Sequence, residues 1–337
     1  MAFLFLPTHS VPYRHHSLLF SSKSSSLFSP LHHPATSSRP CRCSGHPRAL
    51  QPRSLHRRQE DYVLLSSIQS AYDDDMAILK ASETSASRYA GSKILVNASG
   101  NILSMYNQNC IWTDLYFDEF ASLPPIIPEG PIAILGLGGG TAARILLELW
   151  PSRKLEGWEI DKRLVDIARV HLGLATLESP TSKGGFLSVH VGDALSSAAS
   201  VNGGFSGILI DLFSKGKILP QLQKPETWHE LKQRLRPRGR IMVNCGGSCV
   251  ECRDSQPDCD DGTWTWEDGS AARDATLYAM AHVFPQLSWR KMELKEDNYL
   301  ALTGPLPDLK VWAKDVPMRL RPGVLAWLRF TQGSWIG

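Results

Sequence analysis

The chain has 337 residues, of which 42% are hydrophobic and 20% are charged, an ordinary composition for a soluble globular enzyme with more than one average domain. Its formal net charge is +3, but the first 59 residues contain eight Lys or Arg and no Asp or Glu. The remainder therefore has 28 basic and 33 acidic residues, a net of −5. Overall charge gives no support for a nucleic-acid partner.

Residues 1–59 differ in composition from the rest of the chain. They contain twelve Ser and seven of the eleven His, so they resemble an organelle transit peptide and are excluded from the fold. Ser and His richness with few early arginines favours a chloroplast address; a disordered tail with no address is the alternative. No apolar stretch reaches the roughly 18 residues of a membrane span, so no membrane partner is expected.

Residues 60–123 read as short strands and turns rather than helices, which predicts a small N-terminal β-domain. Ser99-Gly100-Asn101 separates two apolar runs and predicts a hairpin. The residues expected to form its buried face are Ile94, Val96, Ile102 and Tyr106.

Three prolines, Pro124, Pro125 and Pro128, mark a boundary before a second domain, residues 130–304. In that domain strands and helices alternate, which predicts an α/β, Rossmann-like doubly wound sheet. The expected parallel strands are Ile132–Leu135, Leu155–Ile160, Phe186–Val191, Ser206–Ile210 and Arg240–Asn244. The expected helices between them include Thr141–Trp150, Lys162–Leu172 and Trp228–Leu235.

The end of this domain is predicted to be a helix, Ala271–Phe284, and a terminal antiparallel hairpin. The hairpin would pair Leu287–Leu294 with Tyr299–Leu302 around the turn at Glu296-Asp297-Asn298. A parallel sheet that ends in an antiparallel hairpin is typical of class I methyltransferases. Residues 305–337, with scattered Trp and Leu, are predicted to pack on the domain as a tail.

The stretch Pro131–Trp150 reads as a buried strand, a glycine turn and a helix, which favours a nucleoside-cofactor site. Such a turn alone is a weak signal. Here the glycines Gly136, Gly138 and Gly140 depart from the dehydrogenase fingerprint, which needs its third glycine one position later, at Thr141. We predict that these three glycines bind the cofactor.

Ligands of open α/β sheets bind beyond the carboxyl ends of the strands, where this sequence places four polar features, the glycine turn among them. Glu159, 19 residues after Gly140, suits the two hydroxyls of an unphosphorylated ribose; capping the next helix is the alternative, for which Asp161 is better placed. Asp193 is predicted to accept a hydrogen bond from an adenine amine, with Ala194 leaving room for the ring, or else to form a turn. Asp211 is predicted to act as a base or to hold a cationic group, or else to cap a helix.

The stretch Tyr116 to Asp211 resembles the spermidine synthase branch of the class I S-adenosyl-L-methionine-dependent methyltransferases. That family has a Y-H-E segment, a G-G-G-D-G-G turn, V-E-I-D, G-D and D-S-S-D-P. Matching positions here are Tyr116, Gly136, Gly138, Gly140, Glu159, Asp161, Asp193 and Asp211. The resemblance implies that Tyr116 and Asp211 are catalytic and face the acceptor, that Asp161 belongs to the cofactor site, and that the protein forms homodimers.

Departures from the family pattern fall on its acids and its histidine. Phe117 replaces the His, Asp118 the Glu and Gly139 the Asp of the glycine turn, and Asp211-Leu212-Phe213-Ser214 lacks the second Asp. Each lost carboxylate removes a hydrogen bond of about 1.5 to 3 kcal/mol to a cationic amine. The pattern thus favours S-adenosyl-L-methionine over its decarboxylated form, and methyl transfer to a small-molecule acceptor. The alternatives are an aminopropyltransferase, a non-catalytic nucleoside-binding protein and, more remotely, a dehydrogenase.

Four cysteines, Cys245, Cys249, Cys252 and Cys259, follow the fifth strand with the spacing C-x3-C-x2-C-x6-C. The spacing lacks paired zinc knuckles and no histidine is near, so no metal is assigned. A zinc site, a thiol-regulated pair and incidental thiols in a loop stay open.

Overall fold

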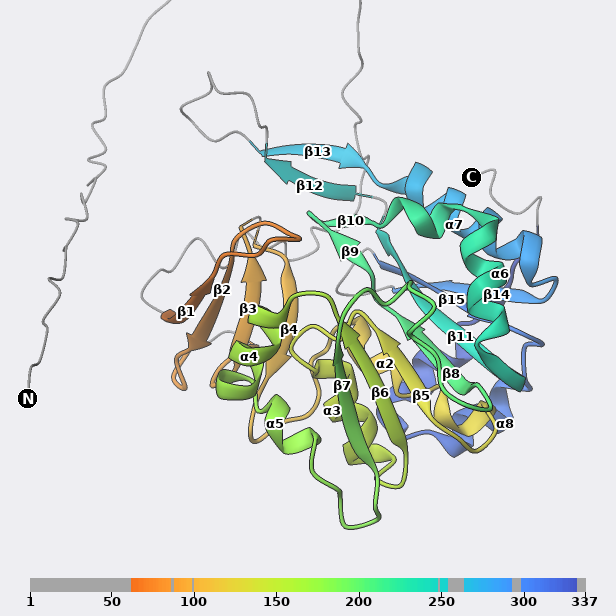
Figure 1. Cartoon of the computed structure of the whole chain (residues 1–337), viewed down its shortest axis with the longest axis horizontal. Helices are drawn as coiled ribbons and strands as arrows, with labels where there is room; N and C mark the ends of the chain where they lie inside the picture. The colour runs from red at the N-terminus through yellow and green to blue at the C-terminus, as the bar shows by residue number, and fades with distance from the viewer. Residues whose placement is uncertain are drawn as a thin grey trace, which may run out of the picture. The chain divides into compact units, whose positions relative to one another are not determined.

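The computed structural model describes residues 62–85, 88–98, 100–247, 249–253, 264–292 and 298–331, all within the unit Pro47–Gly337 (Figure 1). The predicted leader, residues 1–59, lies outside them. None of the helices in these ranges is long and apolar enough to cross a lipid bilayer.

The central element is an eight-stranded sheet in the order β16-β14-β15-β11-β8-β5-β6-β7. Its parallel strands are β5 (Ile132–Leu135), β6 (Lys154–Glu159), β7 (Phe186–Val191), β8 (Phe205–Ile210) and β11 (Leu235–Gly247). Its antiparallel strands are β14 (Leu287–Lys291), β15 (Asn298–Thr303) and β16 (Leu328–Arg329). The doubly wound sheet with a terminal hairpin is confirmed, and the tail adds a strand that the sequence did not predict.

Both faces of this sheet are covered at its centre, because β5 is apolar at every position and β5 and β8 are buried along their whole length. In β5, Ile132 and Ile134 belong to one core cluster, and Ala133 and Leu135 belong to the other. Helices α3 (Thr141–Leu149), α4 (Lys162–His171) and α5 (Leu174–Leu177) contribute to the first cluster. Helices α6 (Pro225–Gln233) and α7 (Ser270–Val283) and the 3-10 turn η3 (Pro220–Gln223) contribute to the second.

The predicted boundaries hold to within one residue for most of these elements, but not around α6. The sequence predicted a helix at Trp228–Leu235; α6 begins three residues earlier, with Pro225 as its first residue, where a proline costs no hydrogen bond. Leu235 instead opens β11, where it pairs with Phe205 of β8. The register then shifts before Arg240, so β11 is longer than predicted.

The N-terminal strands form a separate four-stranded antiparallel sheet. Its strands are β1 (Tyr62–Ile68), β2 (Met76–Ala81), β3 (Lys93–Asn97) and β4 (Ile102–Tyr106). The hairpin between β3 and β4 is confirmed. Its predicted face is partly wrong, because the register shifts where Val96 pairs with Ile102 and Leu95 with Ser104. Met105 therefore takes the place expected for Tyr106 beside Ile94.

One helix interrupts the region predicted to contain only strands and turns: α2 (Tyr116–Phe120), which carries the predicted catalytic tyrosine. A 3-10 turn, η2 (Pro124–Ile126), follows it. The tail forms α8 (Leu309–Asp315), η4 (Met318–Leu320) and α9 (Arg321–Leu325). Its residues Trp312 and Trp327 are buried in the same cluster as Phe120. Packing on the core, rather than local periodicity, stabilises these short helices.

Candidate functional site

The turn between β5 and α3 has a backbone that glycine adopts without strain. Gly136, Gly138 and Gly140 have φ angles of +89°, +55° and +85°. A Cβ on Gly136 would come within 2.2 Å of the Asp211 carbonyl oxygen, so only a glycine lets the end of β5 lie this close to the residue after β8. The turn thereby brings the predicted cofactor loop and the predicted base to one edge of the sheet.

Glu159 is the last residue of β6 and reaches back to the glycine turn. Its Oε2 accepts the N–H of Gly138 at 2.9 Å, and its Oε1 accepts the N–H of Asp161 at 3.1 Å. Burial raises the pKa of this carboxyl group, although the backbone hydrogen bonds from Asp161 and Gly138 oppose the rise. The structure therefore places Glu159 against Gly138, as expected of a side chain that shares a ligand with the turn.

Asp161 and Asp193 occupy different surroundings. Asp161 is buried and caps α4, because its Oδ1 accepts the N–H groups of Arg163 and Leu164 at 2.8 and 3.4 Å. Its Oδ2 is buried with no hydrogen-bond partner among the described residues. Asp193 is exposed and accepts the Leu195 N–H at 2.8 Å, while Ala194 is buried. The structure thus shows Asp161 as a helix cap and Asp193 in a turn, and the cofactor-binding roles of the two residues remain predictions.

Tyr116 and Asp211, the predicted catalytic pair, are in direct contact although 95 residues separate them. The Tyr116 hydroxyl donates to Asp211 Oδ2 at 2.8 Å, and Asn244 Nδ2 donates to Asp211 Oδ1 at 3.1 Å. The amide of Asn244 is held in this orientation because its Oδ1 accepts the Gly246 N–H at 3.0 Å. Each oxygen of the carboxylate therefore has a fixed donor.

Burial of Asp211 raises its pKa to about 6, although the hydrogen bonds from Tyr116 and Asn244 oppose the rise. A carboxyl group of this pKa is mostly ionised at pH 7 and can still take up a proton near that pH. Asp211 therefore has the properties of a general base.

The neighbouring acid, Asp118, faces away from this pair. Its Oδ1 accepts the Thr113 N–H and hydroxyl at 2.9 and 2.7 Å, and its Oδ2 accepts the Asp114 N–H at 3.0 Å. Asp118 is 4% exposed. Its carboxylate thus fixes the loop before α2, where the resemblance had placed an acid of the acceptor site.

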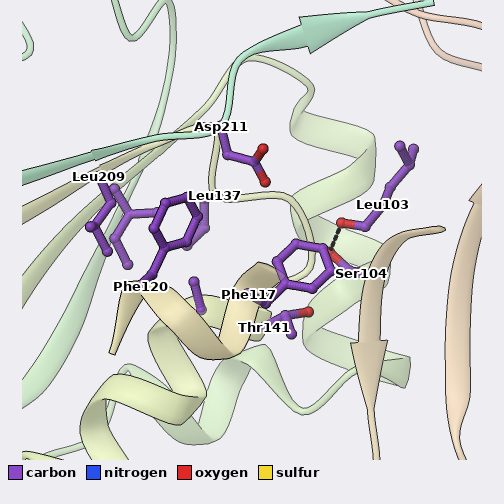
Figure 2. A pocket seen from close by; sticks show the side chains of 11 residues that line it. Leu103, Ser104, Phe117, Phe120, Leu137, Thr141, Leu209 and Asp211 are labelled. Carbon is purple, nitrogen blue, oxygen red and sulfur yellow. Dashed lines mark hydrogen bonds between the residues drawn. The ribbon is translucent and has the colours of Figure 1, made fainter. Parts of the chain in front are cut away.

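A small cavity lies between the glycine turn, α2 and β4 (Figure 2). Asp211 is the one ionisable side chain in its lining. The lining residues are Leu103, Ser104, Phe117, Phe120, Ile134, Gly136, Leu137, Thr141, Ala142, Leu209 and Asp211. Figure 2 shows the Phe117 ring on the Thr141 side of this space and Asp211 projecting from the end of β8. The site therefore combines one carboxyl group with mainly apolar walls.

Strand β4 of the N-terminal sheet closes the other side of the glycine turn. Ser104 Oγ accepts the Gly139 N–H at 2.7 Å and donates to the Leu103 carbonyl at 2.6 Å. The Thr141 hydroxyl exchanges hydrogen bonds with the N–H and C=O of Met105, at 2.9 and 3.1 Å. These contacts join the smaller sheet to the cofactor turn.

Sequence reasoning missed three residues of this site: Ser104, Thr141 and Asn244. Asn244 could have been found from the sequence, because it is a polar residue at the end of an apolar strand. The same criterion selected Asp211. No sequence signal distinguished Ser104 or Thr141, because both act through contacts 35 or 36 residues away in the chain.

The cysteine insert is only partly described. Burial raises the pKa of Cys245 to about 12, which leaves a thiol of low reactivity. Cys249 and Cys252 belong to β12 (Cys249–Arg253), which pairs with β13 (Trp264–Asp268), and Cys259 lies outside the described residues. In the part of the chain that the structure covers, no three His, Cys, Asp or Glu side chains are grouped to hold a metal ion.

Comparisons of sequence find two relatives of different activity. A probable polyamine aminopropyl transferase of Bifidobacterium longum (strain NCC 2705) is 26% identical over 133 residues, 39% of this chain and 28% of the relative. The human eEF1A lysine and N-terminal methyltransferase is 26% identical over 184 residues, 50% of this chain and 22% of the relative. The chain thus spans only about a quarter of the length of each of these curated relatives. No family model matches the chain.

Comparison of structures finds the same fold over nearly the whole length of another protein chain. The crystal structure of a probable spermidine synthase from Corynebacterium glutamicum ATCC 13032 aligns with a TM-score of 0.53 at 16% identity. The alignment covers 81% of this chain and 98% of that one. Together with the strand order and the smaller antiparallel sheet, this match shows that the chain has the spermidine synthase-like, class I methyltransferase fold.

Proposed function

We propose that the protein is an S-adenosyl-L-methionine-dependent transferase that moves a methyl group to a small-molecule acceptor. The observation that carries the proposal is the contact of Tyr116 with Asp211 directly beside the glycine turn. A base with a fixed orientation and a turn shaped for a nucleoside cofactor then share one edge of the sheet.

The residues at this edge fit an adenosyl group. Glu159 offers two carboxylate oxygens to vicinal ribose hydroxyls, next to the N–H of Gly138. Asp193 is exposed, and a Cβ on the preceding Gly192 would meet no atom within 4 Å, so there is open space for an adenine ring. Ala194 adds little bulk there. Asp161 is the fourth residue predicted to contact the cofactor. Its Oδ2 has no hydrogen-bond partner among the described residues, and it follows Glu159 by two residues in the chain.

When bound, S-adenosyl-L-methionine supplies an electrophilic methyl group on a sulfonium centre. This chain's part is to align the acceptor and to take its proton. Asp211 is placed to accept that proton, with Tyr116 and Asn244 holding the carboxylate. Alignment of this kind contributes to the rate in addition to the proton transfer to Asp211.

Three features favour methyl over aminopropyl transfer. Asp118 is occupied by Thr113 and Asp114, so it is not offered to a second amine. Phe117 lines the cavity with an apolar ring. An acid in place of Gly139 would crowd its neighbours, because a Cβ there would approach Leu172 Cδ1 to 2.4 Å.

Aminopropyl transfer from decarboxylated S-adenosyl-L-methionine is the second candidate. The specific observation in its favour is the contact between Tyr116 and Asp211, whose positions match the polyamine enzymes in the motifs given above. In that reaction Asp211 would take the proton of an attacking amine. A nucleoside-binding protein without catalysis is the third reading.

Calorimetric titration of the full chain tests these candidates. S-adenosyl-L-methionine, its decarboxylated form and methylthioadenosine are the three ligands. We expect tightest binding of S-adenosyl-L-methionine. Turnover of putrescine with the decarboxylated form would establish the second candidate instead. Binding without turnover of any acceptor in a broad panel of amines and alcohols would support the third, and absence of binding by all three ligands would refute the proposal.

We also propose that residues 1–59 direct the protein to the chloroplast and that the protein forms homodimers. The first rests on the acid-free, Ser-rich and His-rich composition. A fusion of residues 1–59 to a fluorescent reporter in plant cells tests it, and a cytosolic signal would refute it. Sedimentation equilibrium of the 37.4 kDa chain tests the second, and a monomer at micromolar concentration would refute it.

A further inference from the structure

The helix that carries Tyr116 is too short to hold its own position. Helix α2 has five residues, and its N-cap, Leu115, makes no side-chain cap hydrogen bond. Isolated helices of this length are not stable in water, so tertiary contacts decide where the Tyr116 hydroxyl lies. Those contacts come from α3 and from the C-terminal part of the chain.

The strongest of them is an ion pair between α2 and β14. Arg290 Nη2 lies 2.6 Å from Glu119 Oε2, and the two side chains are 5% and 15% exposed. The Arg290 guanidinium also lies 5.7 Å from the ring centroid of Trp327 in the tail. An ion pair so far removed from solvent is little screened and has one favourable geometry.

Helix α9 of the tail is shaped around this ion pair. A Cβ on Gly323 would come within 2.5 Å of Glu119 Oε2 and 2.6 Å of Arg290 Nη1. Only a residue without a side chain fits there, so the tail covers the ion pair closely. Pro322, just before it, is the second residue of α9 and lies in the first turn, where a proline costs no helix hydrogen bond.

Two tryptophans hold the C-terminal end of α2. Trp312 Nε1, from α8, donates to the Ser122 carbonyl at 2.8 Å, and Trp150 Nε1, just after α3, donates to the Ala121 carbonyl at 2.9 Å. Both carbonyls belong to residues that directly follow α2. The Glu119 ion pair adds a side-chain contact that restrains the rotation of α2 about its own axis.

We propose that Glu119 and Arg290 are positioning residues that hold Tyr116 in hydrogen-bonding contact with Asp211. The inference rests on the proposed function for its catalytic meaning, but the positioning itself concerns the protein alone. It gives the C-terminal segment, in which the sequence showed no chemistry, an indirect part in the site. Glu119 is three residues from Tyr116, so both project from the same short helix.

The titration of Asp211 reports the contact without any knowledge of the acceptor. The groups that the structure places on its carboxylate are Tyr116 from α2 and Asn244 from β11. Charged residues on the β9 (Phe213–Ser214) and β10 (Lys217–Ile218) hairpin that follows are Lys215 and Lys217, and Asp73 accepts the Lys215 N–H at 2.7 Å. Substitutions at 119 and 290 leave Asn244, Lys215, Lys217 and Asp73 unchanged, so that Tyr116 is the neighbour of Asp211 whose position they test.

The experiment measures the half-titration pH of Asp211 by carbon-13 NMR of labelled aspartate carboxyls, assigned by the signal lost in Asp211→Asn. Loss of the Tyr116 hydroxyl in Tyr116→Phe should raise that pH by about 1 unit. The test variant is Glu119→Met/Arg290→Met, which removes both charges and leaves none unpaired, so that it stays folded. We expect at least half of the Tyr116→Phe shift in this variant, and no shift beyond that of Tyr116→Phe alone when the three substitutions are combined.

The matched control is Asp274→Asn, which disrupts the pair with Arg273, another arginine of low exposure, 6%. It should leave the Asp211 titration unchanged. An unshifted titration in a folded Glu119→Met/Arg290→Met protein would overturn the proposal, as would a shift that adds fully to that of Tyr116→Phe. Failure of S-adenosyl-L-methionine to bind the wild-type chain would refute the proposed function and leave this result standing.

Discussion

The two halves of the candidate site are built differently. The nucleoside half, made of the glycine turn Gly136–Gly140, Glu159 and Asp193, comes from consecutive strand ends of one sheet. The acceptor half, made of Tyr116, Asp211 and Asn244, joins a short helix to two strand ends across 95 and 33 residues of chain. Local sequence therefore specifies the first half, and the packing of distant segments specifies the second.

This difference predicts which properties should vary independently. Substitutions in the nucleoside half should change cofactor affinity and leave the Asp211 titration alone. Substitutions in the acceptor half should change the rate and its pH dependence and leave cofactor affinity alone. Four substitutions test that separation, in order of decreasing expected effect.

Asp211→Asn should lower the rate of transfer by about 100-fold to 10,000-fold, because the amide cannot accept the acceptor's proton. In the wild type the rate should fall as pH drops through about 6, since the carboxylate is the active form and burial raises its pKa to about 6. Steady-state rates between pH 5 and 8 check both effects. Cofactor affinity, measured by calorimetry, should stay within about twofold if this half acts through proton transfer and alignment.

The stability of Asp211→Asn serves as its control. A carboxyl group whose pKa is raised by folding favours the protonated form in the folded state, so its ionisation destabilises the wild type as pH rises from about 4 to about 6. The variant lacks that cost, so it should be no less stable than the wild type in urea at pH 8. If the variant is less stable than the wild type, misfolding would explain the lost rate, and the result would contradict the role of Asp211 as a base.

Glu159→Ala should weaken S-adenosyl-L-methionine binding by at least about 10-fold to 100-fold, because each charge-assisted hydrogen bond to a ribose hydroxyl contributes about 1.5 to 3 kcal/mol. Glu159→Gln is the matched variant, since it keeps the shape and one acceptor oxygen and should lose less. Isothermal titration calorimetry at pH 7.5 measures both. Equal affinity in all three proteins would mean that Glu159 serves the glycine turn alone.

Gly139→Ala should destabilise the fold by about 1 to 3 kcal/mol, because its Cβ would lie 2.4 Å from Leu172 Cδ1 and 2.9 Å from Ser104 Cβ. Urea unfolding measures the change. Leu172→Ala in the same chain removes the nearer obstacle, so the double variant should lose less stability than the sum of the two single variants. Additive losses would show that the turn is not confined in this way.

Asn244→Ala should raise the half-titration pH of Asp211 by about 1 unit, the smallest of the four effects, because one hydrogen bond to the ionised form is lost. Two measurements report this change. The pH below which the rate falls should move to a higher value, and so should the midpoint of the Asp211 carboxyl titration followed by NMR. Asn244→Asp should raise the half-titration pH further, by adding a like charge. A lowered value in either variant would contradict the donor role of the amide.

The fold was predictable because its central strand β5 is apolar without alternation and helices α3 and α6 begin at glycine or proline signals. Ile132–Leu135 was predicted exactly for this reason. Helix α2 was not, since Tyr116–Phe120 is too short for periodicity to register and depends on contacts with the tail. The bulge in β4 was also invisible, because it depends on the pairing register and not on the local residue pattern.

The candidate site was likewise predictable where it depends on strand order, and not where it depends on the packing of distant segments. The strand-end rule brought Glu159, Asp193 and Asp211 to one edge, because that edge follows from parallel topology alone. It could not show that Asp118 turns away, since that orientation depends on the Thr113 and Asp114 donors in the preceding loop. Nor could it show that Ser104 lies against Gly139, because docking of the two sheets produces that contact.

The contact of Ser104 and Leu172 with Gly139 has a consequence for how activities can interchange on this fold. An acid at position 139 would cost stability on its own, because its Cβ would crowd the Ser104 and Leu172 side chains. A lineage that moves between an acidic turn and a bare glycine turn would lose less stability if it first made space in β4 or after α4. The reaction specificity of such enzymes would then depend partly on the neighbours of the turn, and ancestral reconstructions should find those neighbours changing first.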